Sequence, residues 1–208
     1  MQDTKLSNLG AVSASLYVSF QVIANVLSTK IALLPFINWP IDGGTLIYPL
    51  TFTLRDFVHK TLGKKNARQI VLLAGGVNVV MVLLFILVGK MTPDVSWQFQ
   101  QSYENILLPV WRITIASIFS QIISELLDTE IFSYAFKKFS DTKAVLFSNS
   151  VALVVDSFLF SFLAFFGQMP LKSVLQIVVT NIIIKMVMSV VSVPSIKLVP
   201  RRVDINEI

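Results

Sequence analysis

The stretch AVLFSNSVALVVDSFLFSFLAFFG, residues 144–167, is an apolar run with a single acidic residue, Asp156, near its middle. A second run, LKSVLQIVVTNIIIKMVMSVVSV (171–193), carries Lys185 at a similar depth. Each run is long enough to cross a bilayer, which takes about 20 apolar residues in a helix. An unpaired charge at mid-bilayer costs at least ~2.5–3.5 kcal/mol. The two charges therefore point to an ion pair between helices, and to transport or binding within the membrane.

The composition of the whole chain agrees with a membrane protein. Its 208 residues are 54% hydrophobic and only 14% charged, with a mean hydropathy of +0.74. A soluble domain carries about 25% charged residues. We predict an all-α membrane protein with one transmembrane domain over residues 1–208, inserted in the cell (inner) membrane. Its six predicted spans are residues 9–34, 44–60, 68–91, 106–136, 144–167 and 171–198.

Basic residues predict the orientation of these spans. The connections and ends on one side hold 11 Lys and Arg residues: Lys5, Lys60, Lys64, Lys65, Arg68, Lys137, Lys138, Lys143, Lys197, Arg201 and Arg202. The opposite connections hold only Lys172, with Lys90 at a span edge. The positive-inside rule then places both termini in the cytoplasm. The net charge of +5 is thus better explained by lipid orientation than by nucleic acid, and we expect no nucleic-acid partner.

Several kinds of site are excluded or disfavoured. The chain has no Cys and only one His, His59, so thiolate and multi-His metal centres are excluded, and we expect no metal or cofactor. Neither Gly43–Gly44 nor Gly75–Gly76 has the context of a phosphate-binding loop. Asp128 and Asp156 lack the contexts of an aspartyl protease pair, and we expect no enzyme activity. An ion channel is disfavoured because no carbonyl-rich repeat is visible.

Polar residues in the last three segments fall on definable helix faces. The fourth segment has one polar stripe, at spacings of three and four: Thr114, Ser117, Gln121, Glu125 and Asp128. In the fifth segment Asn149 shares a face with Asp156, and the sixth has its own stripe: Asn181, Lys185, Ser189 and Ser192. Lipid penalises such stripes, so they should face a protein interior or a hydrated cavity. They serve either to join helices or to line a pocket in which Asp156 and Lys185 exchange partners with a substrate.

The first three segments are less polar. Asn25 lies towards the outer end of the first segment. In the second segment we expect Asp56 to point inward. Pro49 interrupts this second segment. The third has only Asn78 and is predicted to be mainly structural. Residues of small size recur at every fourth position in the first segment: Ala11, Ser15 and Ser19. This pattern suits close helix packing, either within the fold or with a second copy in a homo-oligomer.

Five stretches resemble the queuosine-precursor transporter family, also labelled vitamin uptake transporters. They are ANVLSTK (24–30), GTLIYPLTFTLRDFVHKTLGKKNAR (44–68), RITIASIFSQIISELLDTEIFSYAFKK (112–138), VDSFLFSFLAFFG (155–167) and NIIIKMVMSVVSVP (181–194). The resemblance implies import of 7-deazaguanines (7-cyano- or 7-aminomethyl-7-deazaguanine, or queuine) for tRNA modification. It also implies a six-helix fold similar to the substrate-binding subunits of energy-coupling-factor transporters.

The resemblance also implies site residues, carried over at matching motif positions: Asn25, Phe52, Asp56, Glu125, Asp128, Asp156 and Lys185. Gln121, Asn149 and Asn181 complete the predicted substrate-binding set, because they share polar faces with these residues. The chain departs from the family pattern where Lys60 replaces an acidic residue, Leu153 replaces Gln or Asn, and Ser189 replaces Glu. The loss of a polar group at Leu153, one turn before Asp156, leaves open which base is preferred.

The chemistry of a guanine-like base agrees with this prediction. Its N1–H and exocyclic NH₂ are adjacent donors. A carboxylate can accept from both of them in a bidentate, charge-assisted way. Lys185, Asn25 or Asn181 can donate to O6, while Phe52 or Tyr48 stacks on the ring. Two alternatives stay open: a vitamin-binding subunit that passes its ligand to a separate energising complex, and a structural membrane protein whose polar stripes only join helices. The sequence also leaves open whether transport is proton-coupled or facilitated.

Overall fold

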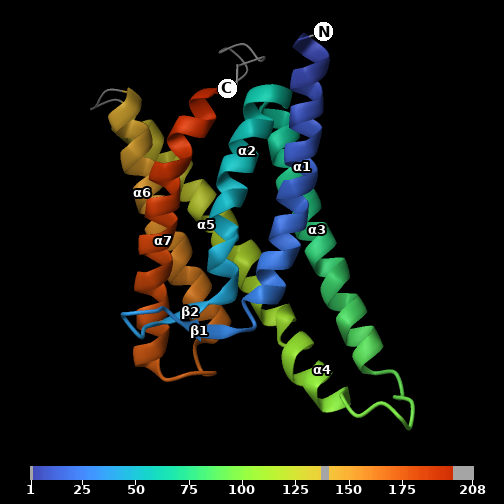
Figure 1. The fold of residues 1–208 in the computed structure, drawn as a ribbon. Coiled ribbons are helices and arrows are strands. Elements are labelled where there is room, and N and C mark those ends of the chain that lie inside the picture. The colour runs from blue at the N-terminus through green and yellow to red at the C-terminus, as the bar shows by residue number, and fades with distance from the viewer. Residues whose placement is uncertain (1, 137–140, 199–208) are drawn as a thin grey trace.

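The computed structural model describes residues 2–136 and 141–198 (Figure 1). Within these residues the chain forms seven α-helices: α1 (Gln2–Leu27), α2 (Tyr48–Leu62), α3 (Lys64–Gly89), α4 (Gln100–Leu107), α5 (Val110–Phe136), α6 (Asp141–Phe165) and α7 (Leu171–Leu198). A two-stranded hairpin, β1 (Ile31–Leu33) and β2 (Pro40–Asp42), and a short 3₁₀ helix, η1 (Gly43–Leu46), separate α1 from α2. The fold is therefore almost entirely helical, with one small sheet that the all-α prediction did not include.

The long helices run up and down along one axis, and the start of α1 and the end of α7 lie at the same end of the bundle (Figure 1). The β1–β2 hairpin, α4 and the α6–α7 turn lie at the opposite end. Among the described residues, four stretches are long and apolar enough to cross a membrane: Ser7–Leu27, Lys65–Gly89, Gln100–Ser124 and Leu171–Met188. A shorter apolar stretch, Ser150–Phe165, lies in α6. Several membrane crossings are thus present, whereas a total of six, and cytoplasmic ends, stay predictions.

The distribution of side chains is the reverse of that in a water-soluble protein. Among the residues whose burial is described, 19 buried side chains are polar or charged and 15 are hydrophobic. Large apolar side chains point outward instead, as with Leu72, Leu83 and Leu87 on α3. Lipid solvates apolar groups but leaves polar ones without partners, so polar side chains are directed inward. The outer surface of the bundle suits a bilayer.

The first predicted span was wrong in its outer part. We expected apolar sequence to continue as helix to residue 34, but α1 ends at Leu27 and Ala32 pairs with Ile41 in the antiparallel hairpin. Proline lacks an N–H group and interrupts helices, and Pro35 and Pro40 lie on either side of the turn. The turn also contains two residues with positive φ, Phe36 (74°) and Asn38 (54°). Hydrophobicity alone did not distinguish this apolar hairpin from helix.

The second predicted span also begins later than expected. Residues 43–46 form η1, and α2 starts at Tyr48 with Pro49 in its first turn. Proline is tolerated there because that N–H has no partner within the helix. Pro49 therefore starts α2 and does not interrupt it. A Cβ atom on Gly44 would lie 2.5 Å from the Ala24 carbonyl oxygen and 2.1 Å from Ser28 Oγ, so glycine allows η1 to lie directly against α1.

The fourth predicted span, 106–136, is divided in the structure. Residues Gln100–Leu107 form α4, and α5 begins at Val110, after Pro109. The other predicted boundaries shift by a few residues: α3 begins at Lys64 and not at 68, and α6 covers Asp141–Phe165. The sixth segment matches α7, Leu171–Leu198. The proline at the boundary again explains the break, because it cannot donate to the preceding turn.

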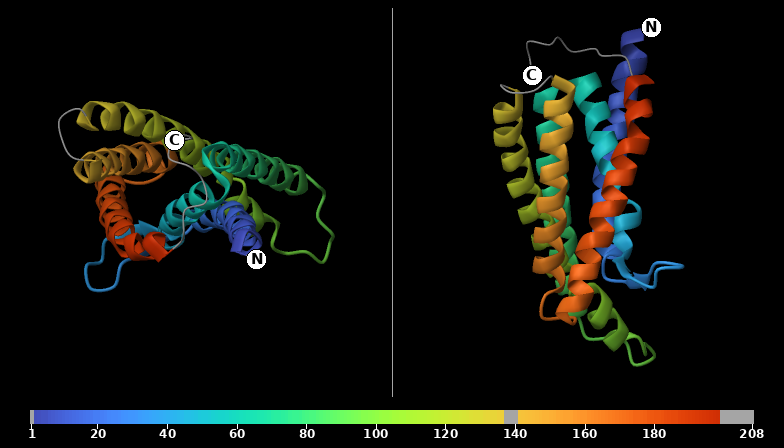
Figure 2. Two further views of the ribbon diagram at one scale, coloured as in Figure 1. Left: turned by 90° about the horizontal axis from the view of Figure 1, so that it is seen from above. Right: turned by 90° about the vertical axis from the view of Figure 1, so that its left-hand side faces the viewer.

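Helices α5 and α6 lie side by side along their length, and α7 packs against α6 (Figure 2). Small side chains at this contact, including Ala116, Ser120 and Ser157, are almost completely buried and allow close approach. At the hairpin end, Arg112 of α5 donates from Nε to the Leu163 carbonyl oxygen (2.7 Å). Its Nη2 donates to the Phe166 carbonyl oxygen. Arg112 thus binds carbonyl groups at the end of α6.

Candidate functional site: a buried polar cavity

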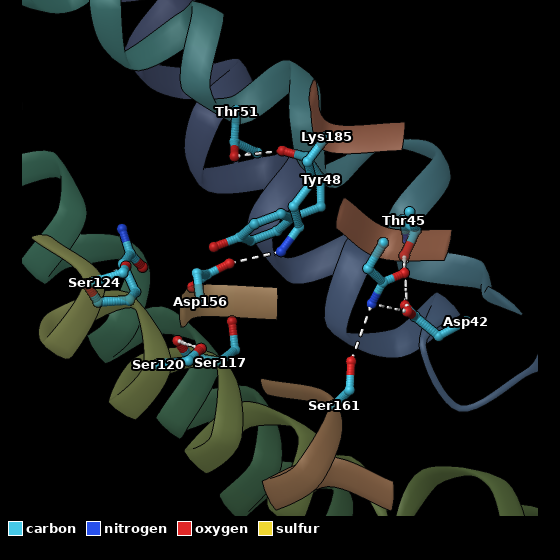
Figure 3. A network of polar contacts seen from close by, with 12 residues as sticks. Asp42, Thr45, Tyr48, Thr51, Ser117, Ser120, Ser124, Asp156, Ser161 and Lys185 are labelled. Carbon is cyan, nitrogen blue, oxygen red and sulfur yellow. Dashed lines mark hydrogen bonds and ion pairs between the residues drawn. The ribbon is translucent and has the colours of Figure 1, made fainter. Parts of the chain in front are cut away.

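The predicted pairing of Asp156 and Lys185 is present. Lys185 Nζ on α7 lies 2.6 Å from Asp156 Oδ2 on α6, and the two side chains are only 3% and 5% exposed. Buried charges of opposite sign require such pairing, because desolvation of either charge alone costs several kcal/mol. Figure 3 shows the pair in the interior of the bundle, near Tyr48 of α2 and Ser117 of α5, two helices that are distant from α6 and α7 in sequence.

Aromatic rings surround the ammonium group of this pair. Lys185 Nζ lies 4.9 Å from the centroid of the Tyr48 ring and 6.0 Å from that of Phe160. A cation over a ring face is attracted by the ring quadrupole. Tyr48 comes from the first turn of α2, and the Thr51 hydroxyl donates to its carbonyl oxygen at 2.6 Å (Figure 3). The ion pair is therefore bordered by the flat ring of Tyr48, whose backbone carbonyl is held by a hydrogen bond in the first turn of α2.

A second buried carboxylate, Asp42, lies at the junction of β2 and η1. Its Oδ1 accepts from the Ser28 hydroxyl (2.7 Å) and the Thr45 backbone N–H (3.2 Å). Its Oδ2 accepts from Asn181 Nδ2 (3.0 Å) and lies 2.7 Å from Thr45 Oγ1. Asp42 thereby joins α1, η1 and α7, as Figure 3 shows for the Thr45 and Asn181 side of the network.

A third polar contact connects α1 with α3. Asn25 Nδ2 donates to Asn78 Oδ1 at 2.8 Å, and both side chains are buried. Asn78 in turn donates to the Ala74 carbonyl oxygen of its own helix at 2.9 Å. Asn78 thus has the structural role that we predicted for the third segment, and it orients Asn25.

The ion pair, the Asp42 network and Asn25 border one narrow cavity, whose free volume of about 20 Å³ is roughly that of one or two water molecules. The lining residues come from seven elements and from Ser28, just after α1: Ala24, Asn25, Ser28, Asp42, Gly44, Thr45, Tyr48, Ser117, Ser120, Asp156, Phe160, Asn181 and Lys185. The cavity therefore offers hydrogen-bond donors, acceptors and an aromatic face for a compact ligand.

Four of the ten predicted substrate-binding residues line this cavity: Asn25, Asp156, Asn181 and Lys185. Three others are described but are not among the lining residues: Phe52, Asp56 and Gln121. Phe52 packs edge-on against Tyr48 with ring centroids 5.4 Å apart, and Gln121 Nε2 donates to the Tyr17 hydroxyl at 3.2 Å. The last three predicted residues are Glu125, Asp128 and Asn149, and their side chains are not among those that the structure describes.

Sequence reasoning missed Asp42, Thr45 and Ser28 as lining residues. Asp42 was placed in a loop between predicted helices, so helical periodicity gave no face to which it could be assigned. A usable signal was present in Asp42-Gly43-Gly44-Thr45, because an acidic residue followed by residues of small size can accept from the backbone of a tight turn. Tyr48 was predicted only as an alternative to Phe52, and the structure places Tyr48 at the cavity.

Comparison with known proteins identifies the family. A family model described as "Putative vitamin uptake transporter" matches residues 42–199, which include most of the cavity. The chain belongs to this family. A relative in Bacillus subtilis (strain 168), described as "Probable queuosine precursor transporter", is 27% identical over 157 residues, which cover 73% of this chain and 68% of the relative. No solved structure matches the chain.

Membership of this family has direct consequences. The protein is a multi-pass membrane transporter of the cell membrane and not an enzyme. A transporter binds a small molecule, and the buried polar cavity is the place in the described structure where polar groups from many helices converge.

Proposed function

We propose that this protein imports a queuosine precursor, a 7-deazaguanine base such as 7-cyano- or 7-aminomethyl-7-deazaguanine or queuine, for tRNA modification. Family membership and the name of the Bacillus subtilis relative support the class of substrate. The buried cavity supports a binding site within the membrane. We also propose that the chain crosses the membrane six times, with both termini in the cytoplasm. This fold is similar to that of the substrate-binding subunits of energy-coupling-factor transporters.

The observation that carries the proposal is the Asp156–Lys185 pair. It presents a donor and an acceptor side by side, 2.6 Å apart, on a cavity wall. The guanine edge presents the complementary pattern: O6 accepts, while N1–H and the exocyclic NH₂ donate. Lys185 can donate to O6 while Asp156 accepts from the two adjacent donors, a charge-assisted contact. The ligand then replaces part of a contact that the two side chains otherwise make with each other.

Other lining residues suit a flat heterocycle. Tyr48 and Phe160 offer aromatic faces near Lys185, and Asn25 offers a side-chain amide from α1. Phe52, Asp56, Gln121, Glu125, Asp128 and Asn149 remain predicted substrate contacts, for example along the path to the cavity.

Uptake by a host that cannot make the precursor tests the proposal. Cells that express the protein are supplied with a 7-deazaguanine, and queuosine in their tRNA is measured. Wild type should restore queuosine, and Asp156→Asn should reduce uptake at least tenfold at equal protein level in the membrane. Asp94→Asn, in an exposed loop, is the matched control and should transport like wild type. Full transport by Asp156→Asn would contradict the proposed site.

A second function, binding of a vitamin for a separate energising complex, is favoured by the family description. A thermal-stability screen of the purified protein against 7-deazaguanines and common vitamins separates the two. Stabilisation by a vitamin alone, together with co-purification of an ATPase pair, would replace the proposal with this alternative.

A further inference from the structure

Among the described residues, three charged side chains line the cavity, and their charges do not cancel. Asp156 and Lys185 neutralise each other through their 2.6 Å contact. Asp42, which is only 1% exposed, is the third. Among the described side chains no Lys, Arg or His forms an ion pair with Asp42, and its partners Ser28, Thr45 and Asn181 are all neutral. The described part of the lining therefore carries one surplus negative charge.

The partners of Asp42 are all donors, which is the pattern expected around a carboxylate. An ionised carboxylate only accepts hydrogen bonds, and its two oxygens offer about four acceptor positions. Ser28 Oγ, Thr45 N and Asn181 Nδ2 donate to three of these positions. Hydrogen bonds from neutral donors stabilise the charged form but do not neutralise it.

The Thr45 hydroxyl can free the fourth acceptor position. Its Oγ1 lies 2.7 Å from Asp42 Oδ2 and 2.5 Å from Asn181 Oδ1. A hydroxyl has one hydrogen and can donate to only one of these oxygens at a time. When Thr45 Oγ1 turns away from Asp42 Oδ2 and donates to Asn181, a donor on the ligand can take its place on Asp42 Oδ2.

We infer that the cavity selects a ligand that carries one positive charge, and that Asp42 is the residue that selects it. The inference rests on the proposed function and narrows it: among 7-deazaguanines, the best ligands have an ammonium group on the 7-substituent, as in the 7-aminomethyl base. The Asp156–Lys185 pair binds the guanine edge, and Asp42 binds the ammonium group. A neutral 7-cyano base leaves the Asp42 charge without a partner.

Binding of matched ligands to the purified protein tests this inference. The 7-aminomethyl and 7-cyano bases have nearly the same size and differ in charge. Wild type should bind the cationic base at least about tenfold more tightly, since a desolvated charge-assisted contact contributes about 1.5–3 kcal/mol. Asp42→Asn should reduce this preference to within about threefold, mainly through weaker binding of the cationic base. Asp94→Asn should keep the full preference.

Further arms separate the possible outcomes. Asp42→Glu keeps the charge, so a variant that folds should retain a preference for the cation even if Asp42→Asn does not fold. A thermal-stability measurement identifies which variants fold. If no 7-deazaguanine binds but the cationic vitamin thiamin does, and neutral riboflavin does not, the proposed function fails and the charge inference stands. Tighter binding of the 7-cyano base by wild type, an equal loss for both bases in Asp42→Asn, or no binding of any cation would overturn the inference.

Discussion

Lys185 Nζ of α7 lies 2.6 Å from Asp156 Oδ2 of α6, and the two side chains are at most 5% exposed. The two residues are 29 positions apart in sequence and come together because α6 and α7 are antiparallel neighbours joined by a short turn. The pair therefore joins two helices and also forms a wall of the cavity. Stability and ligand binding depend on it in different ways, which allows the two roles to be measured separately.

Removal of one partner should destabilise the protein more than removal of both. In Asp156→Asn or Lys185→Gln one buried charge is left without its counter-ion, which typically costs about 3–5 kcal/mol. The double variant Asp156→Asn/Lys185→Gln has no unpaired charge and should regain most of this loss. Unfolding of the purified protein in a denaturing detergent measures the three free energies. Equal destabilisation by the single and double variants would show that the two charges do not interact.

Substitution of Gly44 should separate η1 from α1. In Gly44→Ala the new Cβ meets Ser28 Oγ at 2.1 Å and the Ala24 carbonyl oxygen at 2.5 Å, so the backbone must move. Overpacking of this kind costs about 1–3 kcal/mol. Displacement of η1 should also weaken ligand binding, since Thr45 and Asp42 move with it. Gly76→Ala is the control, because no atom lies within 4 Å of its added Cβ. A Gly44→Ala protein as stable as the Gly76→Ala protein would refute the close packing.

Arg112 should contribute to stability without contacting the ligand. Arg112→Gln removes the donors to the Leu163 and Phe166 carbonyl oxygens, and hydrogen bonds from a charged group contribute about 1.5–3 kcal/mol. The melting temperature should fall while the affinity of the folded fraction for ligand stays the same. Lys90→Gln, at an exposed position after α3, should change neither quantity. Lower affinity in folded Arg112→Gln would assign Arg112 a role in the site.

The predicted orientation can be tested directly because the natural chain has no cysteine. Single cysteines are introduced at Lys65 and Ser96, which are exposed at opposite ends of α3 and its following loop. A membrane-impermeant thiol reagent added to intact cells should label Ser96→Cys and leave Lys65→Cys unmodified. Labelling of Lys65→Cys alone would reverse the orientation that the basic residues predict.

The sequence predicted those features of the site that follow from helical periodicity. Asp156, Lys185 and Asn181 were placed on inward faces because lipid penalises polar groups, and all three line the cavity. Asn25 was found in the same way and through the family resemblance. The pairing of Asp156 with Lys185 followed from their similar estimated depths in neighbouring segments.

The part of the site that sequence did not predict lies outside regular helices. Asp42 and Thr45 belong to a hairpin and a 3₁₀ turn, where the predicted loop that contains Asp42 meets the mostly apolar stretch predicted as helix from residue 44. Tyr48 lines the cavity while Phe52, one turn later, packs against it, since α2 begins only at Tyr48. Periodicity gives the face of a helix but not where the helix begins, so it did not decide between Tyr48 and Phe52, which share one face.

The most direct test of the central claim is equilibrium binding of 7-aminomethyl-7-deazaguanine to purified wild type and to Asp156→Asn/Lys185→Gln. This double variant keeps the neutral balance of the pair and is expected to fold. Wild type should bind one base per chain, and the folded double variant should bind at least tenfold more weakly. Wild-type affinity in a folded double variant would contradict the claim that this ion pair binds the ligand.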